Sequence, residues 1–157
     1  MKVKLVVIGK TDSKYLNEGI ANYQKRLKHY LPTDFVVIPD IKNTKNLSED
    51  QQKKKEGELI LAQIQQGDFV VLLDEKGKEY SSVEFAKFVE KQMLAGLKSL
   101  IFVIGGPYGF SDDVYNKANF NLSLSRLTFS HQMVRLIFWE QLYRAMTILK
   151  GEPYHHN

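Results

Sequence analysis

The sequence predicts an α/β domain in which helices cover both faces of a mainly parallel sheet. Segments typical of strands and helices alternate along the whole chain, and the strand segments are continuous apolar runs, as in strands buried on both faces. The chain has 157 residues, of which 43% are hydrophobic, and no linker, repeat or low-complexity tract divides it. We therefore expect residues 1–157 to form one domain.

The first half of the chain contains the first predicted strands and helices. Residues 2–8 form a buried strand, and Asp12 caps a helix whose apolar residues recur every three or four positions up to Tyr30. Residues 35–38 form a second strand, which ends at a proline. Ser48 then opens, through a capping box, a charged helix that we expect to end near Gln65.

The second half continues the alternation. Residues 69–73 form a strand, Ser81 opens a helix through a second capping box, and residues 100–104 form another strand. A glycine-rich turn at residues 105–109 leads to a short helix capped by Ser111. A last strand at 120–124 precedes a long helix that ends at 149 and is apolar around most of its circumference, which predicts burial on several sides.

Composition excludes several classes of protein. Without cysteine, the chain has no disulfide framework, thiolate metal site or cysteine nucleophile, and we expect no metal centre. No run approaches the ~20 apolar residues of a membrane span, and the N-terminus lacks the features of a signal peptide, so we expect a cytoplasmic protein that binds no membrane. The net charge of +4 and the pI near 9.1 favour polyanionic partners such as nucleic acid.

Three strand ends are expected to converge on one crevice. Ligands of open α/β sheets bind beyond the carboxyl ends of the strands, which here are residues 73–75, the turn at 105–109 and the loop after Leu124. Gly105 and Gly106 would let the backbone approach a ligand closely. The turn lacks the spacing of a dinucleotide or phosphate loop, so a purely structural turn is the alternative.

The last helix carries charges on an otherwise apolar surface. His131 and Arg135 are four residues apart on one helical face, where a histidine is either a satisfied core residue or a chemical group, and the buried arginine needs an anionic partner. Glu140 and Arg144, also four apart, are interpreted as an intrahelical ion pair or part of a dimer interface. The tail at 151–157 is either frayed or held in place.

Seven segments together resemble the bacterial large-subunit rRNA methyltransferase H family, which belongs to the SPOUT superfamily. The resemblance spans nearly the whole chain. The segments are NYQKRL (22–27), EGELIL (56–61), LDEKGK (73–78), FVIGGPYG (102–109), LSLSRLTFSHQMVR (122–135), EQLYRA (140–145) and GEPYHH (151–156).

The resemblance implies a function and a cofactor. Members use S-adenosylmethionine to methylate N3 of a pseudouridine in 23S rRNA, so the expected substrate is 23S rRNA in the large subunit or the assembled ribosome. Their C-terminal part passes through a loop to form a trefoil knot, which holds the cofactor and lies in a homodimer interface. The cofactor contacts implied for this chain are Leu73, Gly105, Leu124, Ser125, Arg126, Leu127, Thr128 and Phe129.

The resemblance also suggests catalytic roles. The N3 proton of pseudouridine must be removed, and negative charge develops on the flanking carbonyl oxygens. We expect Arg135 to stabilise that charge, His131 or His155 to accept the proton and Tyr154 to position the base, with the tail of one subunit completing the site of the other. Ser130 stands where the family usually has proline, and as a helix cap it should preserve the geometry.

RNA contacts are expected from the basic first helix and from the cofactor loop, although simple solubilising charges are the alternative. Two other functions stay open: a catalytically silent RNA- or ribosome-binding module of the same fold, and a nucleotide-binding protein that uses the glycine turn for phosphate. The residues expected to contact RNA are Lys14, Lys25, Arg26, Lys28 and Arg126.

Overall fold

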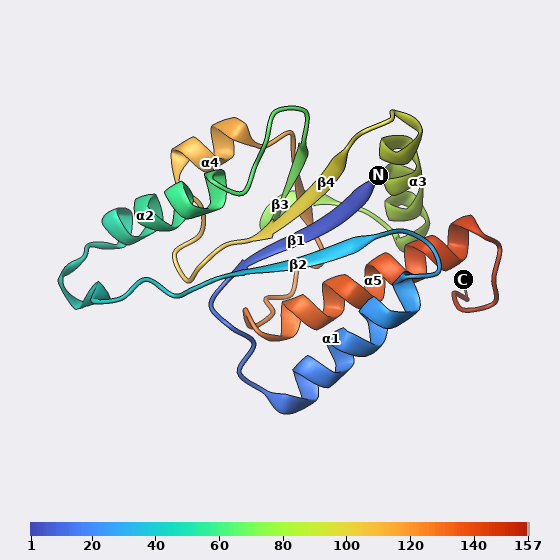
Figure 1. Ribbon diagram of the computed structural model, residues 1–157, viewed down its shortest axis with the longest axis horizontal. Helices are drawn as coiled ribbons and strands as arrows, with labels where there is room; N and C mark the ends of the chain where they lie inside the picture. The colour runs from blue at the N-terminus through green and yellow to red at the C-terminus, as the bar shows by residue number, and fades with distance from the viewer. Residues whose placement is uncertain (157) are drawn as a thin grey trace.

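The computed structural model describes residues 1–156 and contains a five-stranded sheet in the order β2-β1-β4-β3-β5. All neighbouring strands pair in parallel, as predicted (Figure 1). The central strand β4 is buried along its whole length, which explains its unbroken apolar sequence. The strands are β1 (Lys2–Ile8), β2 (Thr33–Ile38), β3 (Phe69–Glu79), β4 (Ser99–Ile104) and β5 (Phe120–Ser123).

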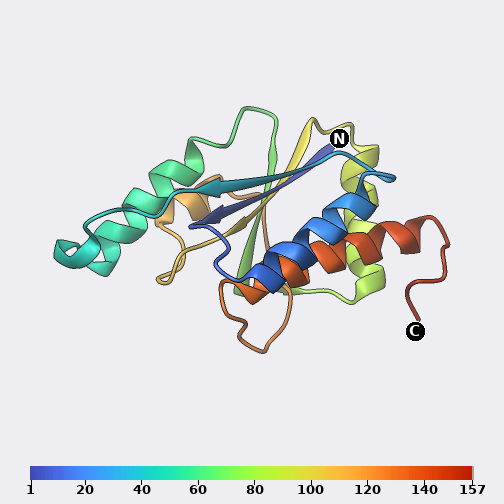
Figure 2. The same ribbon diagram turned by 60° about the horizontal axis from the view of Figure 1, so that its bottom comes forward.

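Helices cover both faces of the sheet (Figures 1 and 2). On one face, α1 (Lys14–Leu27), α3 (Ser82–Leu94) and α5 (Met133–Leu149) pack over the larger hydrophobic core. On the other, α2 (Glu49–Leu61) and α4 (Asp112–Lys117) cover a smaller core. The predicted fold class is therefore confirmed, and no helix among the described residues is long and apolar enough to cross a membrane.

Two predicted helix boundaries are wrong. The helix that begins after Ser48 ends at Leu61 and not near Gln65, because Gln65 belongs to a turn in which its N–H donates to Asp68. Asp12 does not cap α1, since the N-cap is Ser13 and no side chain accepts a hydrogen bond there. The Asp12 backbone N–H instead donates to Gln132, just before α5, which ties the starts of α1 and α5 together.

Strand β3 continues past its predicted end at Leu73. Leu73 and Lys78 both align with Leu122 of β5, so the residues between them bulge out of the strand. Gly77 lies so close to the β5 backbone that a Cβ there would be 2.7 Å from the Asn121 carbonyl group, and only glycine fits. The bulge brings Asp74 and its neighbours to the carboxyl edge of the sheet.

Helices α1 and α5 run side by side in the same direction. Near their starts, Gly19 of α1 lies against Leu136, and near their ends Tyr143 of α5 contacts the rings of Tyr23 and Tyr30. Several large side chains of α5, including Trp139, are fully buried, which confirms the predicted burial on several sides. Because α5 begins at the carboxyl edge of the sheet, it ends at the opposite edge.

Candidate active site

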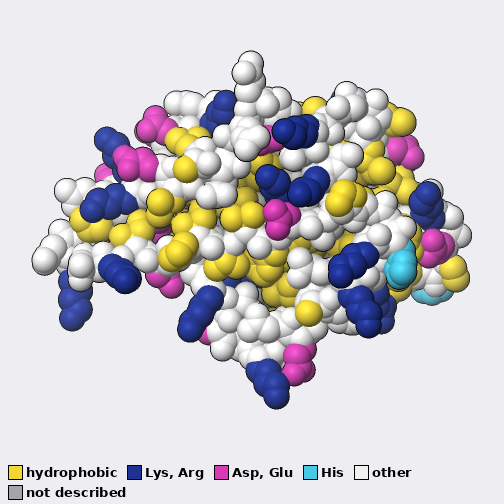
Figure 3. Space-filling model, viewed as in Figure 1, with side chains coloured by type: hydrophobic (Ala, Val, Ile, Leu, Met, Phe, Trp, Pro, Cys, Tyr) yellow, Lys and Arg dark blue, Asp and Glu magenta, His cyan; other side chains and the backbone are white. Residues whose placement is uncertain are grey.

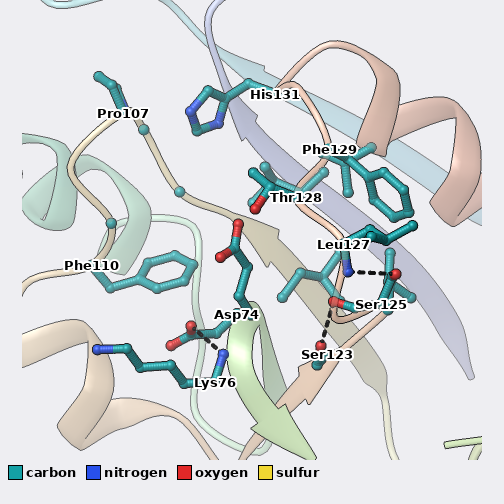
Figure 4. A pocket seen from close by; sticks show the side chains of 18 of the residues that line it. Asp74, Lys76, Pro107, Phe110, Ser123, Ser125, Leu127, Thr128, Phe129 and His131 are labelled. Carbon is teal, nitrogen blue, oxygen red and sulfur yellow. Dashed lines mark hydrogen bonds between the residues drawn. The ribbon is translucent and has the colours of Figure 1, made fainter. Parts of the chain in front are cut away.

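A cavity of about 370 Å³ lies at the carboxyl ends of β3, β4 and β5, within the size range of small-molecule sites. The sequence predicted convergence at this edge, and Figure 4 shows side chains from the three segments around the cavity. Every residue implied as a cofactor contact lines it except Arg126, which is exposed. Those lining residues are Leu73, Gly105, Leu124, Ser125, Leu127, Thr128 and Phe129.

The loop after β5 is shaped by its own serines. The Ser123 hydroxyl donates to the backbone carbonyl of Ser125 at 2.9 Å, and the Ser125 hydroxyl accepts from the backbone N–H of Leu127, also at 2.9 Å (Figure 4). These local hydrogen bonds fix the path of the loop around the cavity, although the loop contains no helix or strand. Leu127 is left 75% exposed at the rim, so apolar surface is available to a ligand or a second chain.

The glycine turn forms another wall, and side chains are not accommodated at its first two residues, Gly105 and Gly106. A Cβ at Gly105 would meet the Phe110 ring at 3.0 Å. A Cβ at Gly106 would meet the carboxylate of Glu56 on α2 at less than 2.5 Å. Backbone therefore forms this part of the cavity, as a closely fitting ligand requires.

Glu56 is a feature that the sequence analysis missed. Its side chain is 3% exposed, Oε2 accepts a hydrogen bond from Gln52, and Oε1 has no hydrogen-bond partner in the described structure. Burial raises the pKa of this carboxyl, with a smaller effect from Asp40, while Gln52 and His131 act in the opposite direction. The only feature of the sequence that could have indicated this buried carboxyl is its neighbour Gly57, a small residue in a helix that we interpreted as exposed to solvent.

Two carboxylates and one lysine, Asp74, Glu75 and Lys76, line the cavity. Asp74 accepts a hydrogen bond from the backbone N–H of Lys76 and one from the Tyr115 hydroxyl at 2.5 Å, while burial and Asp74 raise the pKa of Tyr115 to about 12. Glu75 also lines the cavity, and Asp112 begins the helix that follows the glycine turn. Carboxylates therefore outnumber ammonium groups in the cavity lining, which favours a ligand that carries positive charge.

His131 lies at the edge of the cavity with an exposed side chain (Figure 4). It is not a satisfied core histidine, and its ring is accessible to a substrate at the cavity mouth. The preceding Ser130 is not the expected cap, because the N-cap of α5 is Gln132 and has no side-chain cap hydrogen bond, but the Ser130 hydroxyl accepts a hydrogen bond from the Met133 N–H at 3.1 Å and so holds the turn that enters the helix.

Arg135 points away from the cavity, toward the segment after β1. It is 2% exposed and donates to the carbonyl oxygens of Ile8, Gly9 and His131 and to the Thr11 hydroxyl, at 2.8–3.1 Å. Burial lowers its pKa. The anionic partner expected for this arginine is replaced by carbonyl oxygens, so it holds the backbone at His131 and after β1 in place.

Tyr154 and His155 lie at the other end of α5 and are held there. The Tyr154 hydroxyl donates to Glu140 at 3.3 Å, and His155 Nδ1 lies 3.1 Å from the Arg144 guanidinium. Arg144 also bonds Glu140 at 2.5 Å and lies over the Tyr154 ring. Burial raises the pKa of Tyr154. The predicted ion pair is confirmed, and it organises the tail, a role that the sequence did not indicate.

The structure therefore brings together only part of the predicted catalytic set. Helix α5 begins beside the cavity at Met133, and the tail side chains contact it at Glu140 and Arg144, about 10 and 16 Å further along its axis. His131 lies at the cavity, whereas Tyr154 and His155 lie beside the end of α1, near Tyr23. Within one chain, the tail does not reach the cavity.

Comparison with known proteins identifies the family. A family described as "Predicted SPOUT methyltransferase" matches residues 1–155. The chain belongs to the SPOUT methyltransferase family. Proteins named "Ribosomal RNA large subunit methyltransferase H" from Christiangramia forsetii, Parabacteroides distasonis and Flavobacterium psychrophilum are 64%, 63% and 62% identical to it over 99% of each chain. This SPOUT methyltransferase thus belongs to the methyltransferase H group, which confirms the resemblance.

One solved structure, a probable methylase family protein from Haemophilus influenzae Rd KW20, aligns over 95% of this SPOUT methyltransferase with 13% identity and a TM-score of 0.46. The aligned part is 66% of that protein. The family assignment rests on the sequence matches. Among residues 1–156, no group of three or more histidine, aspartate or glutamate side chains is placed to hold a metal ion.

Proposed function

We propose that this chain transfers a methyl group from S-adenosylmethionine to N3 of a pseudouridine in 23S rRNA of the large ribosomal subunit. The observation that carries the proposal is the cavity at the sheet edge, which is lined by nearly all the cofactor residues that the family implies. Relatives at 62–64% identity carry the name of a large-subunit rRNA methyltransferase. We place the reaction in the cytoplasm, where ribosomes are found.

The cavity fits this cofactor better than it fits a nucleotide. S-adenosylmethionine would be held by Leu73, by the backbone at Gly105 and by the loop at 124–129, and its sulfonium supplies an activated methyl group. Asp74 and Glu75 place negative charge beside a cationic ligand. Although Lys76 also lines the cavity, the two carboxylates oppose the triphosphate of ATP, which counts against the nucleotide-binding alternative.

The protein's own task is to orient the base and remove its N3 proton. His131 is accessible at the cavity edge and can accept that proton on a ring nitrogen, and His155 is the second candidate. Tyr154 would position the base, and Arg144 beside it is placed to stabilise the developing negative charge. We assign Arg135 a positioning role, because its hydrogen bonds hold the backbone at His131.

The proposed enzyme is a homodimer in which the tail of one subunit completes the cavity of the other. Tyr154 and His155 are too far from their own cavity to act there, so their use in the reaction requires a second copy. Apolar side chains exposed near the cavity, including Leu127 and Tyr108, are available for that interface. We also propose the trefoil knot of the SPOUT family for the segment that enters α5.

Two measurements test the proposed function against its alternatives. Calorimetric titration should show binding of S-adenosylmethionine and little or no binding of ATP, and the reverse would favour a nucleotide-binding protein. Label from methyl-labelled S-adenosylmethionine should then enter ribosomal RNA when the protein is incubated with unmodified large subunits, ribosomes or free rRNA. Binding to ribosomes without transfer of label to any of these substrates would favour the catalytically silent module.

A further inference from the structure

We propose that the rRNA phosphate backbone is held by the subunit that supplies the tail, in a groove lined by lysines, while the partner subunit supplies the cofactor. This inference rests on the proposed function, since it requires the homodimer and its shared site. It specifies which subunit recognises the substrate and through which residues.

The groove has a volume of about 640 Å³ and lies between α1 and the starts of β1 and β2. Lys2, Lys25 and Lys28 line it, and all are exposed. None of these lysines forms an ion pair within residues 1–156, whereas Lys14 at the other end of α1 approaches Glu18 at 4.0 Å. In Figure 3, lysine and arginine side chains gather over the C-terminal half of α1. Such exposed, unpaired cations suit phosphate oxygens.

The groove and the cavity lie at opposite edges of the sheet. Lys2 begins β1 and Thr33 begins β2, so the groove is at the amino ends of the strands, whereas the cavity is at the carboxyl ends. Seven residues of β1 correspond to about 20 Å. These lysines are therefore poorly placed to bind phosphates beside a base that reacts in the cavity of the same chain.

The tail, in contrast, lies at the same end as the lysines. The Tyr30 hydroxyl donates to Glu152 at 2.5 Å, and the Tyr23 and Tyr154 hydroxyls are 3.5 Å apart. Lys25 and Lys28 lie between Tyr23 and Tyr30 in the sequence but on the other side of α1, about one helix diameter from the residues that contact the tail. Where the tail of one subunit completes the cavity of its partner, these lysines lie at the same edge of the sheet as that shared site and can hold the phosphates that continue past it.

Mixed dimers test the assignment. One chain carries Lys25→Glu and Lys28→Glu, and the other carries Gly105→Val, which fills the cofactor cavity. If the lysines act across the dimer, a mixed dimer has one intact site, made from the cavity of the first chain and the lysines of the second. Each variant alone should be nearly inactive. Random pairing should restore roughly a quarter of the wild-type rate, because half the dimers are mixed and each has one intact site.

The result that would overturn the inference is a mixture no more active than the separate variants, with mixed dimers confirmed by differential tagging. The lysine variant must still bind S-adenosylmethionine and dimerise, and its lowered affinity for rRNA should come with a shallower salt dependence, by about one unit of slope for each lysine lost. Lys54→Glu with Lys55→Glu, exposed on α2, is the matched control and should retain activity. Equal loss in this control would also contradict the inference.

A failure of the proposed function gives a different result. If the wild-type chain transfers no methyl group to ribosomal RNA, the proposed reaction is wrong. If the wild type is active and lysine reversal changes neither rRNA affinity nor the Michaelis constant for the RNA, only the inference about the groove fails. Lys25→Gln with Lys28→Gln provides a milder pair that removes the charges without introducing repulsion, and it should give a smaller loss in the same direction.

Discussion

Glu56 on α2 lies directly behind the glycine turn that forms one wall of the cavity. Its carboxyl group is pressed against Gly106, and one of its oxygens has no hydrogen-bond partner in the described chain. A buried carboxylate in this position is costly, so the protonated form is favoured and the pKa of Glu56 is raised above its ordinary value of 4.5. Ionisation of Glu56 therefore destabilises the region that supports the glycine turn.

Replacement of Glu56 by glutamine makes this cost measurable. As pH rises above 4.5, the unfolded state releases the Glu56 proton before the folded state does, so the wild type loses stability until the raised pKa has been passed. The stability of Glu56→Gln relative to wild type should therefore increase over that interval and then level off. Chemical denaturation at a series of pH values measures it, with the exposed Glu58→Gln as control. A difference that does not vary with pH would contradict this interpretation.

At the residue scale, the spacing of residues in the sequence indicated which side chains are important but not where those side chains point. The spacing of His131 and Arg135 correctly indicated that a buried arginine near the start of α5 needs hydrogen-bond partners. It did not indicate that these partners would be the carbonyl oxygens after β1. That choice depends on a segment more than a hundred positions away in the sequence. Glu56 was missed for the same reason, because its burial arises from contact with the distant Gly106.

At the element scale, local signals predicted most starts. Both capping boxes, at Ser48 and Ser81, are present with reciprocal hydrogen bonds. The bulge in β3 could not be predicted, because it reflects the pairing of Leu73 and Lys78 with one residue of β5. The sequence did not decide whether the tail is frayed or held in place, because the residues that hold it, such as Tyr23 and Glu140, come from two helices.

The tail is expected to contribute to methyl transfer but not to cofactor binding. Removal of residues 154–157 should abolish methyl transfer while the affinity for S-adenosylmethionine stays unchanged, because the cavity residues are left intact. Within the full chain, His155→Ala or His131→Ala should lower the rate about 10²–10⁴-fold, according to which histidine accepts the proton. Single-turnover rates and calorimetry separate the two effects. Loss of cofactor binding on truncation, or full activity in both histidine variants, would count against these roles.

At the scale of the whole molecule, the order of elements predicted a parallel sheet covered on both faces, and the structure confirms it. A threaded chain could not be predicted from patterning, since such connections are rare, and the trefoil knot stays a proposal based on the family. The same holds for the homodimer. The observation that favours it is the separation of the cavity from the cluster around Arg144, which lies about 16 Å along α5 from the start of the helix.

The proposed reaction forms one bond, between a methyl group and N3 of one pseudouridine. Mass spectrometry of digested 23S rRNA shows directly which atom of which nucleotide carries the methyl group. Unmodified large subunits or ribosomes are incubated with the protein and methyl-labelled S-adenosylmethionine, and the nucleosides are then separated and fragmented. We expect a single labelled product, N3-methylpseudouridine, at one position. Label on another base, on a ribose or on a protein, or no label in rRNA while the cofactor still binds, would contradict it.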